Sequence, residues 1–461
     1  MALLNKFPSI LLSISILYYY WKLTITTAYE SSSPSKTQFH VAPMQCYTNA
    51  RTRKLFDLLS PSSIKWTEME KLDDIYPRTE SVDYLLDALE KRLGSPENHH
   101  DKANLVLQLG TNDPDRLQRC VEHTIQHYDN IQEINLNCGC PAIESGGAST
   151  YGASLMKDAK LTGQLVKSAR KGLEGSLGTS HACPKISVKC RIAVFETDQD
   201  MRLLTGRDYD YLKDYVSTMH EHGANHVILH ARPAILSGLS PVKNRIVPTL
   251  DYDFVQRIAS EFEGKMDVTL NGGITTLDQL QSLLENSLSG SKSAISSYMA
   301  GRWCLRRPLD LIGIEALLKG EELNSSLSPI QNAIDQYVDD AIKIGSSSSF
   351  LRHKPTVAEL CLPLFLIVEQ LRDDYNFEED KSDNDDSITL IEPPLLTYDE
   401  MESLYDVLHE GVAQIEDLFG KGKKKKKISN GSVNFKRLSS SFKSLVGTKV
   451  ANKWKRNRAE L

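Results

Sequence analysis

The chain has 461 residues, of which 40% are hydrophobic and 25% are charged, an ordinary globular composition that allows one large and one smaller domain. Its formal net charge of −6 is uneven: residues 421–461 hold 14 Lys/Arg against one Glu, which leaves −19 on residues 1–420. Of its eight cysteines only Cys138 and Cys140 lie close together, which excludes a disulfide framework and a paired zinc signature and predicts reduced thiols and no metal site.

Residues 1–36 have the pattern of a targeting segment that is separate from the fold. Phe7–Trp21 is an apolar run between Lys6 and Lys22, followed by a hydroxyl-rich stretch. About fifteen apolar residues is short for a spanning helix and typical of the hydrophobic part of a signal peptide. Because the lumen of the endoplasmic reticulum would oxidise the thiols, we expect a leader into an organelle, a plastid or mitochondrion. A cytoplasmic protein and an uncleaved segment that contacts a membrane remain alternatives.

Residues 37–320 are predicted to form one (β/α)8 TIM barrel, an α/β fold, because short apolar segments alternate with amphipathic ones. The predicted strands are Phe39–Pro43, Ile64–Glu68, Asn104–Gln108, Ile131–Leu136, Lys185–Lys189, His226–His230, Asp267–Leu270 and Ser297–Ala300. Predicted helices between them include Pro114–Tyr128, Leu155–Leu173, Tyr209–His222, Tyr252–Glu263 and Thr276–Glu285. A doubly wound open sheet is the alternative, but the glycine-rich turn that it needs after an early strand is absent.

Polar, small or glycine residues follow each predicted strand, at the rim where barrels carry their chemistry. The strand Ile131–Leu136 runs into Asn137 and then into the sequence Cys138-Gly-Cys140-Pro. A Gly/Ser-rich loop, Ser145–Tyr151, follows. A cysteine that lies just after a strand end and is followed by a flexible loop is typical of a catalytic cysteine, with the loop covering the site.

The last two strand ends predict a phosphate site. Asn271-Gly272-Gly273 and Gly301-Arg302 offer close backbone N–H groups and a guanidinium, where barrels commonly hold a ligand phosphate.

Three further strand-end side chains favour a flavin. The ammonium of Lys189 suits an anionic ring or a ribityl hydroxyl, Gln108 offers a donor and an acceptor to an imide edge, and His230 adds a polar contact. The predicted contacts suit a ligand with a phosphate, a polyol and an imide ring, and flavin mononucleotide (FMN) has all three, so it fits better than NAD. Pyridoxal phosphate stays open as the cofactor, because enzymes that use it can also be barrels with a lysine at a strand end, where Lys189 lies.

Several segments, in order and spacing, resemble the tRNA-dihydrouridine synthases over about residues 38–320: VAPM, TEM, LQLGTNDPDRLQRC, EINLNCGCP, YGASLM, VKCRI, NGGI and MAGRWCLRRP. The segment HARPAILSGLSPVKNR is similar to the A-type subfamily. The resemblance implies a TIM barrel with FMN at its mouth, contacted by Pro43, Met44, Gln45, Gln108, Lys189, His230, Asn271, Gly272, Gly273, Gly301 and Arg302. It also implies Cys140 as the proton donor, and contacts of Asn137, Arg191 and Arg245 with the target nucleotide or nearby tRNA.

The reaction implied by this resemblance is reduction of the C5–C6 double bond of uridines in the tRNA D-loop, at positions 20 and 20a, with NADPH or NADH as reductant. The residues are consistent with it. Reduced flavin supplies a hydride to carbon 6, and a thiol with an ordinary pKa of about 8.5 is mostly protonated at neutral pH and can protonate carbon 5. The stacked base must be flipped out to reach the flavin.

The resemblance implies that residues 328–461 form a helical tRNA-binding domain, and the sequence predicts helices at Ile330–Gly345, Pro355–Arg372 and Tyr398–Phe419. An acidic stretch at about 373–390 is predicted to be a disordered insertion. Ser441–Leu461 resembles the last helix of the family, so the basic tail is predicted to hold RNA. A solvated tail, an anionic-lipid contact and a nuclear import signal at Lys423–Lys427 remain alternatives.

Two other functional classes remain open. A small-molecule flavin dehydrogenase of the dihydroorotate dehydrogenase kind also uses a flavin barrel with a cysteine near the ring, but the basic tail argues against it. A catalytically silent RNA-binding protein would have no need of Cys140 and the phosphate site. The sequence implies no protein partner, and a monomer is expected.

Overall fold

The structure, a computed structural model, concerns the unit Gln38–Leu461 and describes residues 37–94, 105–141, 151–176, 183–288, 294–322, 327–346, 355–380 and 395–419. The predictions for the leader, for the loop Ser145–Tyr151 apart from its last residue, for the acidic stretch beyond Asp380 and for the basic tail lie outside these residues.

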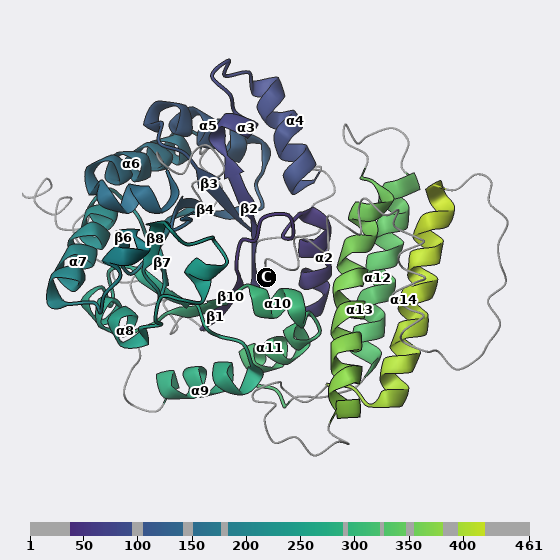
Figure 1. The fold of residues 1–461 in the computed structure, drawn as a ribbon. Coiled ribbons are helices and arrows are strands. Elements are labelled where there is room, and N and C mark those ends of the chain that lie inside the picture. The colour runs from purple at the N-terminus through teal and green to yellow at the C-terminus, as the bar shows by residue number, and fades with distance from the viewer. Residues whose placement is uncertain are drawn as a thin grey trace, which may run out of the picture. The chain divides into compact units, whose positions relative to one another are not determined.

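Eight parallel strands form a closed barrel, which confirms the predicted fold class (Figure 1). They are β1 (Gln38–Val41), β2 (Ile64–Lys71), β3 (Leu105–Gly110), β4 (Ile131–Cys138), β5 (Lys185–Arg191), β7 (His226–His230), β9 (Asp267–Asn271) and β10 (Ser297–Ala300). Each strand pairs with the strands before and after it, and β1 pairs with β10 to close the ring. A separate two-stranded sheet, β6 (Val194–Thr197) and β8 (Ala234–Ser237), follows the ends of β5 and β7.

Helices follow the strands and surround the barrel (Figure 1). They are α2 (Ala50–Leu59), α3 (Leu72–Ile75), α4 (Val82–Leu93), α5 (Pro114–His127), α6 (Ala159–Ser176), α7 (Gly206–Glu221), α8 (Tyr252–Glu261), α9 (Leu277–Leu288), α10 (Arg302–Arg306) and α11 (Asp310–Lys319). Short 3-10 helices are η2 (Gly152–Lys157), η3 (Asp198–Asp200) and η4 (Lys243–Arg245).

Side-chain caps begin several of these helices close after the strand ends. The carboxylate of Asp113 accepts the N–H of Arg116 at 3.1 Å and Pro114 is the first residue of α5. The carboxylate of Asp251 likewise accepts the N–H of Phe254 at 2.8 Å at the start of α8. Because the first N–H groups of a helix have no partner within it, such caps fix where the helix starts and so keep the connections at the rim short.

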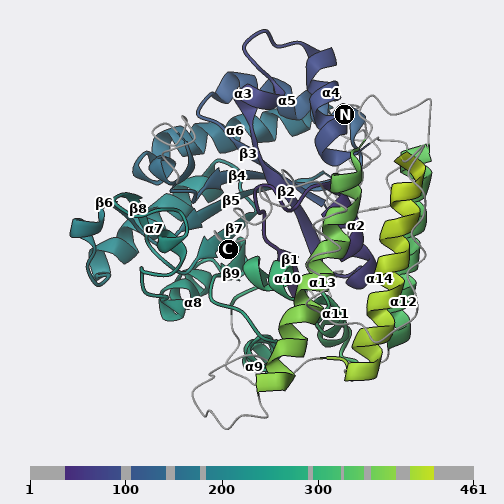
Figure 2. The same cartoon turned by 45° about the vertical axis from the view of Figure 1, so that its right-hand side comes forward.

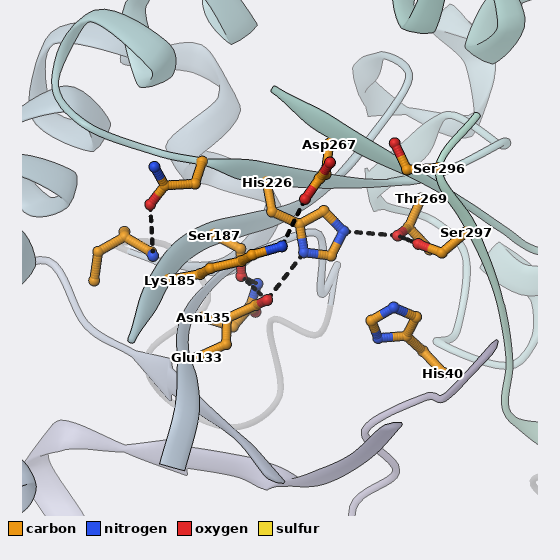
Figure 3. A network of polar contacts seen from close by, with 12 residues as sticks. His40, Glu133, Asn135, Lys185, Ser187, His226, Asp267, Thr269, Ser296 and Ser297 are labelled. Carbon is orange, nitrogen blue, oxygen red and sulfur yellow. Dashed lines mark hydrogen bonds and ion pairs between the residues drawn. The ribbon is translucent and has the colours of Figure 1, made fainter. Parts of the chain in front are cut away.

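The barrel interior is divided between apolar and polar side chains. An apolar cluster, separate from the core between strands and helices, consists of Ala42, Ile64, Trp66, Val106, Ile228 and Met299. Other buried side chains of the interior are polar, and they include Glu133, Asn135, Ser187, His226, Thr269 and Ser297 (Figure 3). Buried polar groups are costly unless they are hydrogen-bonded, and these bond to one another.

Three further helices, α12 (Leu327–Ser346), α13 (Val357–Asp380) and α14 (Tyr398–Phe419), lie side by side, and the first two pack against α2 (Figures 1 and 2). The helix α13 is joined to the barrel by Arg307, whose guanidinium pairs with Asp310 at 2.8 Å and with Asp374 on α13. Among the described residues, no helix is both long and apolar enough to cross a membrane.

The helix α13 extends eight residues beyond its predicted end at Arg372, into the acidic stretch that we expected to be disordered. Asp374 explains the start of this extension, because its side chain is 3% exposed and is bound by Arg307 and by Gln370. A carboxylate-rich composition therefore did not prevent helix formation where one buried carboxylate is paired with a partly buried arginine.

Candidate active site

Direct side-chain contacts join the C-terminal ends of neighbouring strands. Asn137 Nδ2 on β4 donates to Gln108 Oε1 on β3 at 2.8 Å. Lys189 Nζ on β5 donates to Asn271 Oδ1 on β9 at 3.0 Å, and Asn271 Nδ2 donates to the carbonyl oxygen of Met299 on β10 at 2.9 Å. The rim positions predicted from the sequence therefore lie together at one end of the barrel.

The backbone around Cys140 is held at several points. Asn137 Oδ1 accepts the N–H of Gly139 at 3.2 Å and that of Cys140 at 3.1 Å. The carbonyl oxygen of Cys140 accepts the N–H of Ala153 at 2.9 Å, and that of Gly139 accepts Arg191 Nε at 3.2 Å. These contacts fix the backbone that carries the partly exposed thiol of Cys140.

The neighbouring Cys138 differs from Cys140 in access. Its side chain is fully buried in the core, and burial raises the pKa of its thiol to about 12. Cys138 packs the outside of the barrel wall, whereas Cys140 lies in the loop at the rim, so only the latter thiol is placed to meet a ligand.

His230 and the two glycines after β9 fit closely together. Gly272 has φ +106°, and a Cβ atom there would lie 2.5 Å from His230 Cδ2. Gly273 has φ +77°, and a Cβ atom there would lie 2.4 Å from Leu250 Cδ1 and 2.6 Å from the hydroxyl of Tyr252. Burial, together with the charges of neighbouring cations, lowers the pKa of His230 well below its ordinary value. The imidazole is therefore neutral at pH 7 and offers one donor and one acceptor.

Cationic side chains without carboxylate partners gather at this rim. Among the described residues, Lys189, Arg191, Arg232 and Arg302 form no salt bridge, and Arg232 Nε is buried without a hydrogen-bond partner. Burial, with Arg245 nearby, lowers the pKa of Arg302, and burial lowers that of Lys189 to about 8. Positive side chains that no carboxylate neutralises attract an anionic ligand.

The end of β1 is more open. Pro43 and Met44 are partly buried, and a Cβ atom on Gly301 would lie 3.0 Å from the sulfur of Met44, so β1 and β10 approach closely here. Gln45 is exposed, and its Nε2 donates to Glu68 Oε2 at 2.9 Å. Gln45 therefore lies at the edge of the rim and is tied to β2 through Glu68.

Arg245 closes the other side of the rim from η4, where its carbonyl oxygen accepts Arg302 Nη2 at 3.4 Å. This contact brings together two predicted residues that are 57 positions apart, one assigned to tRNA and one to the cofactor.

Four residues that the sequence reasoning did not select are part of this arrangement. Arg232 adds a cation, and the hydroxyl of Tyr252 donates to the carbonyl oxygen of Gly272 at 2.7 Å. Glu133 and Asn135 lie on the same face of β4 as Asn137, because side chains alternate along a strand. Polar residues at three alternate positions of β4, namely Glu133, Asn135 and Asn137, were the available signal. Among the described residues, no group of three or more metal-ligating side chains is present.

Comparison with known proteins identifies the family. A family model described as Dihydrouridine synthase (Dus) matches residues 40–358. The tRNA-dihydrouridine(20/20a) synthase of Shewanella oneidensis is 28% identical over 312 residues, which cover 67% of this chain and 79% of that protein. The protein of the same name from Escherichia coli K12 is 30% identical over 326 residues, which cover 68% of this chain and 81% of that protein.

A solved structure of DHODH from Eimeria tenella in complex with ferulenol is 14% identical, with a TM-score of 0.39, and covers 67% of this chain and 86% of that one. A likeness at this level adds nothing to the fold described above. The family model, in contrast, extends over more than half of the chain and includes every strand end of the rim. The resemblance inferred from the sequence motifs is confirmed: the chain belongs to the dihydrouridine synthase family and is an oxidoreductase.

Proposed function

We propose that this chain reduces uridines at positions 20 and 20a of the tRNA D-loop to dihydrouridine, with FMN as cofactor and NADPH or NADH as reductant. Two observations support the proposal: relatives named for this activity match over about two thirds of the chain, and a partly exposed thiol, Cys140, lies at a rim lined with unpaired cations. The second observation carries the proposal, because it supplies both a proton donor and a binding surface for anions.

The rim residues fit FMN on their own chemistry. Arg232 Nε is an orphaned buried donor, and Lys189 uses one of its three N–H groups on Asn271. Gly272 and Gly273 leave the backbone uncovered where a side chain would collide with its neighbours. A phosphate would be held by Arg302 and the glycine N–H groups, as barrels commonly hold phosphates after their last strands.

The remaining predicted contacts would hold the ring and the polyol. Lys189 would lie against the flavin ring, Gln108 would face its imide edge, and His230, as a neutral imidazole, would bond a hydroxyl or a ring atom. Pro43, Met44 and Gln45 would line the open side at β1.

The chemistry divides between cofactor and protein. When bound, FMN takes electrons from NADPH or NADH and supplies a hydride to carbon 6 of uracil. Cys140 holds the proton for carbon 5 at its sulfur and becomes a thiolate when it delivers it. Lys189 and Arg191 lie near enough to Cys140 for a negative charge on its sulfur to raise the pKa of both cations.

The flipped uridine would be bound by three residues from the rim. Asn137 would contact the base, and Arg191 and Arg245 would contact its phosphates or the adjacent tRNA. Arg191 Nη1 already donates to the carbonyl oxygens of Pro233 and Asn244, each at 3.2 Å, so its guanidinium is held in place before the substrate arrives. Preorganised donors of this kind lose little entropy on binding.

Substitution of the thiol tests the proposal. A Cys140→Ala variant should bind FMN and be reduced by NADPH like the wild type, but form dihydrouridine at least about 100-fold more slowly, the usual contribution of a general acid. Cys46→Ala is the matched control, because Cys46 is a solvent-accessible thiol in the segment that follows β1. Dihydrouridine should be mapped at each position of purified tRNA and, separately, free uracil and orotate should be offered. Undiminished tRNA reduction by Cys140→Ala would contradict the role of the thiol.

The segments outside the described residues belong to the same proposal. The basic tail, residues 421–461, would bind the tRNA backbone, and its deletion should raise the KM for tRNA and flatten the dependence of KM on salt, since fewer counterions are released. Unchanged kinetics would exclude the tail from RNA binding.

Residues 1–36 are proposed to be a leader into an organelle. Fused to a fluorescent protein, they should carry it into a plastid or a mitochondrion; a cytoplasmic location of the fusion would exclude the proposed leader.

A further inference from the structure

A chain of hydrogen bonds links the backbone at Cys140 to the interior of the barrel. It begins with the N–H groups of Gly139 and Cys140, both of which donate to Asn137 Oδ1. Asn137 Nδ2 then donates to Gln108 Oε1 at 2.8 Å, and Gln108 Nε2 donates to Asn135 Oδ1 at 2.8 Å. Three carboxamides thus stand in series beneath the rim.

The chain ends on a buried carboxylate. Asn135 Nδ2 donates to Ser187 Oγ at 2.7 Å, and the hydroxyl of Ser187 donates to Glu133 Oε1 (Figure 3). His226 Nδ1 lies 3.1 Å from Glu133 Oε2, and His226 Nε2 lies 2.6 Å from the hydroxyl of Thr269. Glu133 and His226 are 4% and 3% exposed, so this carboxylate is far from solvent.

Glu133 stays ionised despite its burial. Burial alone would raise its pKa, but His226, the hydroxyl of Ser187 and His40 lower it, and the net effect is a pKa below the ordinary value for a glutamate. A charged carboxylate accepts hydrogen bonds and donates none.

Both ends of the chain therefore require the same direction of donation. Backbone N–H groups at Gly139 and Cys140 can only donate, and the carboxylate of Glu133 can only accept. Each carboxamide between them must turn its oxygen toward the rim end of the chain and its nitrogen toward Glu133. If one carboxamide rotated by half a turn, two donors would face each other on one side and two acceptors on the other, each mismatch leaving buried groups unpaired.

The direction decides what Asn137 offers to a ligand. Both acceptor positions of its Oδ1 are taken by the two backbone N–H groups, and one of its two N–H groups is taken by Gln108. What remains is a single N–H donor. A donor matches a ring carbonyl, as in uracil or the imide edge of a flavin, and is repelled by an exocyclic amino group such as that of cytosine.

We propose that Glu133 is a positioning residue, which acts through Ser187 and Asn135 to hold the carboxamides of Gln108 and Asn137 in the orientation in which Asn137 presents an N–H, and so favours a ring carbonyl over an amino group at the position it contacts. The inference rests on the proposed function, in which these two carboxamides face the flavin and the uracil. It goes beyond that function by assigning part of ring recognition to a carboxylate that contacts neither ring.

A Glu133→Gln variant tests this role, because it keeps the shape of the side chain but can donate to Ser187 and so permits the reverse direction in the lower part of the chain. We expect an FMN dissociation constant about tenfold higher, measured by fluorescence titration of the apoprotein, or a kcat/KM for tRNA about tenfold lower. A tenfold change is about the size of one well-placed hydrogen bond to a charged group. The first readout reports the flavin ring and the second, at saturating FMN, reports the uracil. Glu315→Gln is the matched control: Glu315 is another buried carboxylate, on α11, that accepts from Ser60 and Ser62.

A rescue separates positioning from a merely structural role. In the double variant Glu133→Gln/Asn135→Asp the carboxylate moves two residues along β4 and again accepts from Gln108 Nε2, so the direction at Gln108 and Asn137 is restored. We expect it to regain FMN affinity and turnover to within about threefold of the wild type. If Glu133→Gln alone does not fold, recovery of both readouts in the double variant supports the proposal and their loss overturns it.

The outcomes distinguish this inference from the function on which it rests. Equal FMN affinity and equal turnover in the wild type and Glu133→Gln would overturn the positioning role and leave the proposed function intact. A loss in Glu133→Gln that the double variant does not recover would also overturn it. A wild-type protein that neither binds FMN nor forms dihydrouridine would overturn both.

Discussion

Replacement of Gly272 by alanine should damage the site more than the fold. Gly272 has φ +106°, where an L side chain is strained, and the added Cβ atom would lie 2.5 Å from His230 Cδ2. The backbone strain should cost about 1–2 kcal/mol of unfolding free energy. Ordinary carbon contacts begin near 3.5 Å, so the imidazole must move by about 1 Å. A displacement of this size at a catalytic site can cost about 100-fold in rate.

The assay compares two glycines that both have a positive φ but have different neighbours. Gly264 has φ +73° with nothing within 4 Å of a Cβ atom, so Gly264→Ala should lose stability through strain alone. Thermal unfolding should therefore shift by a few degrees in both variants, whereas only Gly272→Ala should weaken FMN binding and lower kcat/KM for tRNA by about 10- to 100-fold. If Gly272→Ala binds FMN and turns over as well as Gly264→Ala does, His230 is not part of the site and the close fit has no functional meaning.

Two further predictions concern buried charges. Burial, with Arg191 nearby, lowers the pKa of Lys189 from 10.5 to about 8, so the cost of burying this charge is present in full below pH 8 and is relieved as the pH rises toward 10.5. Lys189→Met should thus be more stable than the wild type at pH 7 by a margin that shrinks up to pH 10 in urea titrations; a constant margin would contradict the assigned charge. Arg307→Met leaves Asp310 and Asp374, 1% and 3% exposed, without their cation, and should cost about 3–5 kcal/mol, against less than about 1 kcal/mol for removal of the half-exposed Arg119. Equal losses would show that Arg307 does not couple α13 to the barrel.

The eight barrel strands could be predicted from the sequence because buried parallel strands are short apolar runs between turn residues. The sheet of β6 and β8 was not predicted. Each of its strands has four residues and directly follows the end of a barrel strand, so its sequence has the pattern of a loop. The end of α13 was placed too early, because composition does not reveal that Asp374 meets Arg307, 67 residues away.

The rim residues could be predicted because a barrel brings all its strand ends together, whatever their separation in sequence. The hydrogen-bond chain below the rim could not. It depends on which residue of β3 lies beside Asn135 and on which residue of β5 accepts a hydrogen bond from Asn135. These are matters of strand register, which is a relation between two strands and cannot be read from the sequence of one. Asn135 and Glu133 therefore resemble packing positions until Gln108 and Ser187 are placed next to them.

The division of the barrel interior between an apolar cluster and a polar network has a consequence for how the protein tolerates sequence change. Apolar side chains such as Val106 and Ile228 are held by shape and volume, so other apolar side chains of similar size should be accepted there. The polar network is held by directed bonds, in which an exchange as small as Asn135→Leu leaves partners on both sides unsatisfied. Over evolutionary time the apolar cluster is therefore freer to change, whereas each residue of the network constrains its neighbours.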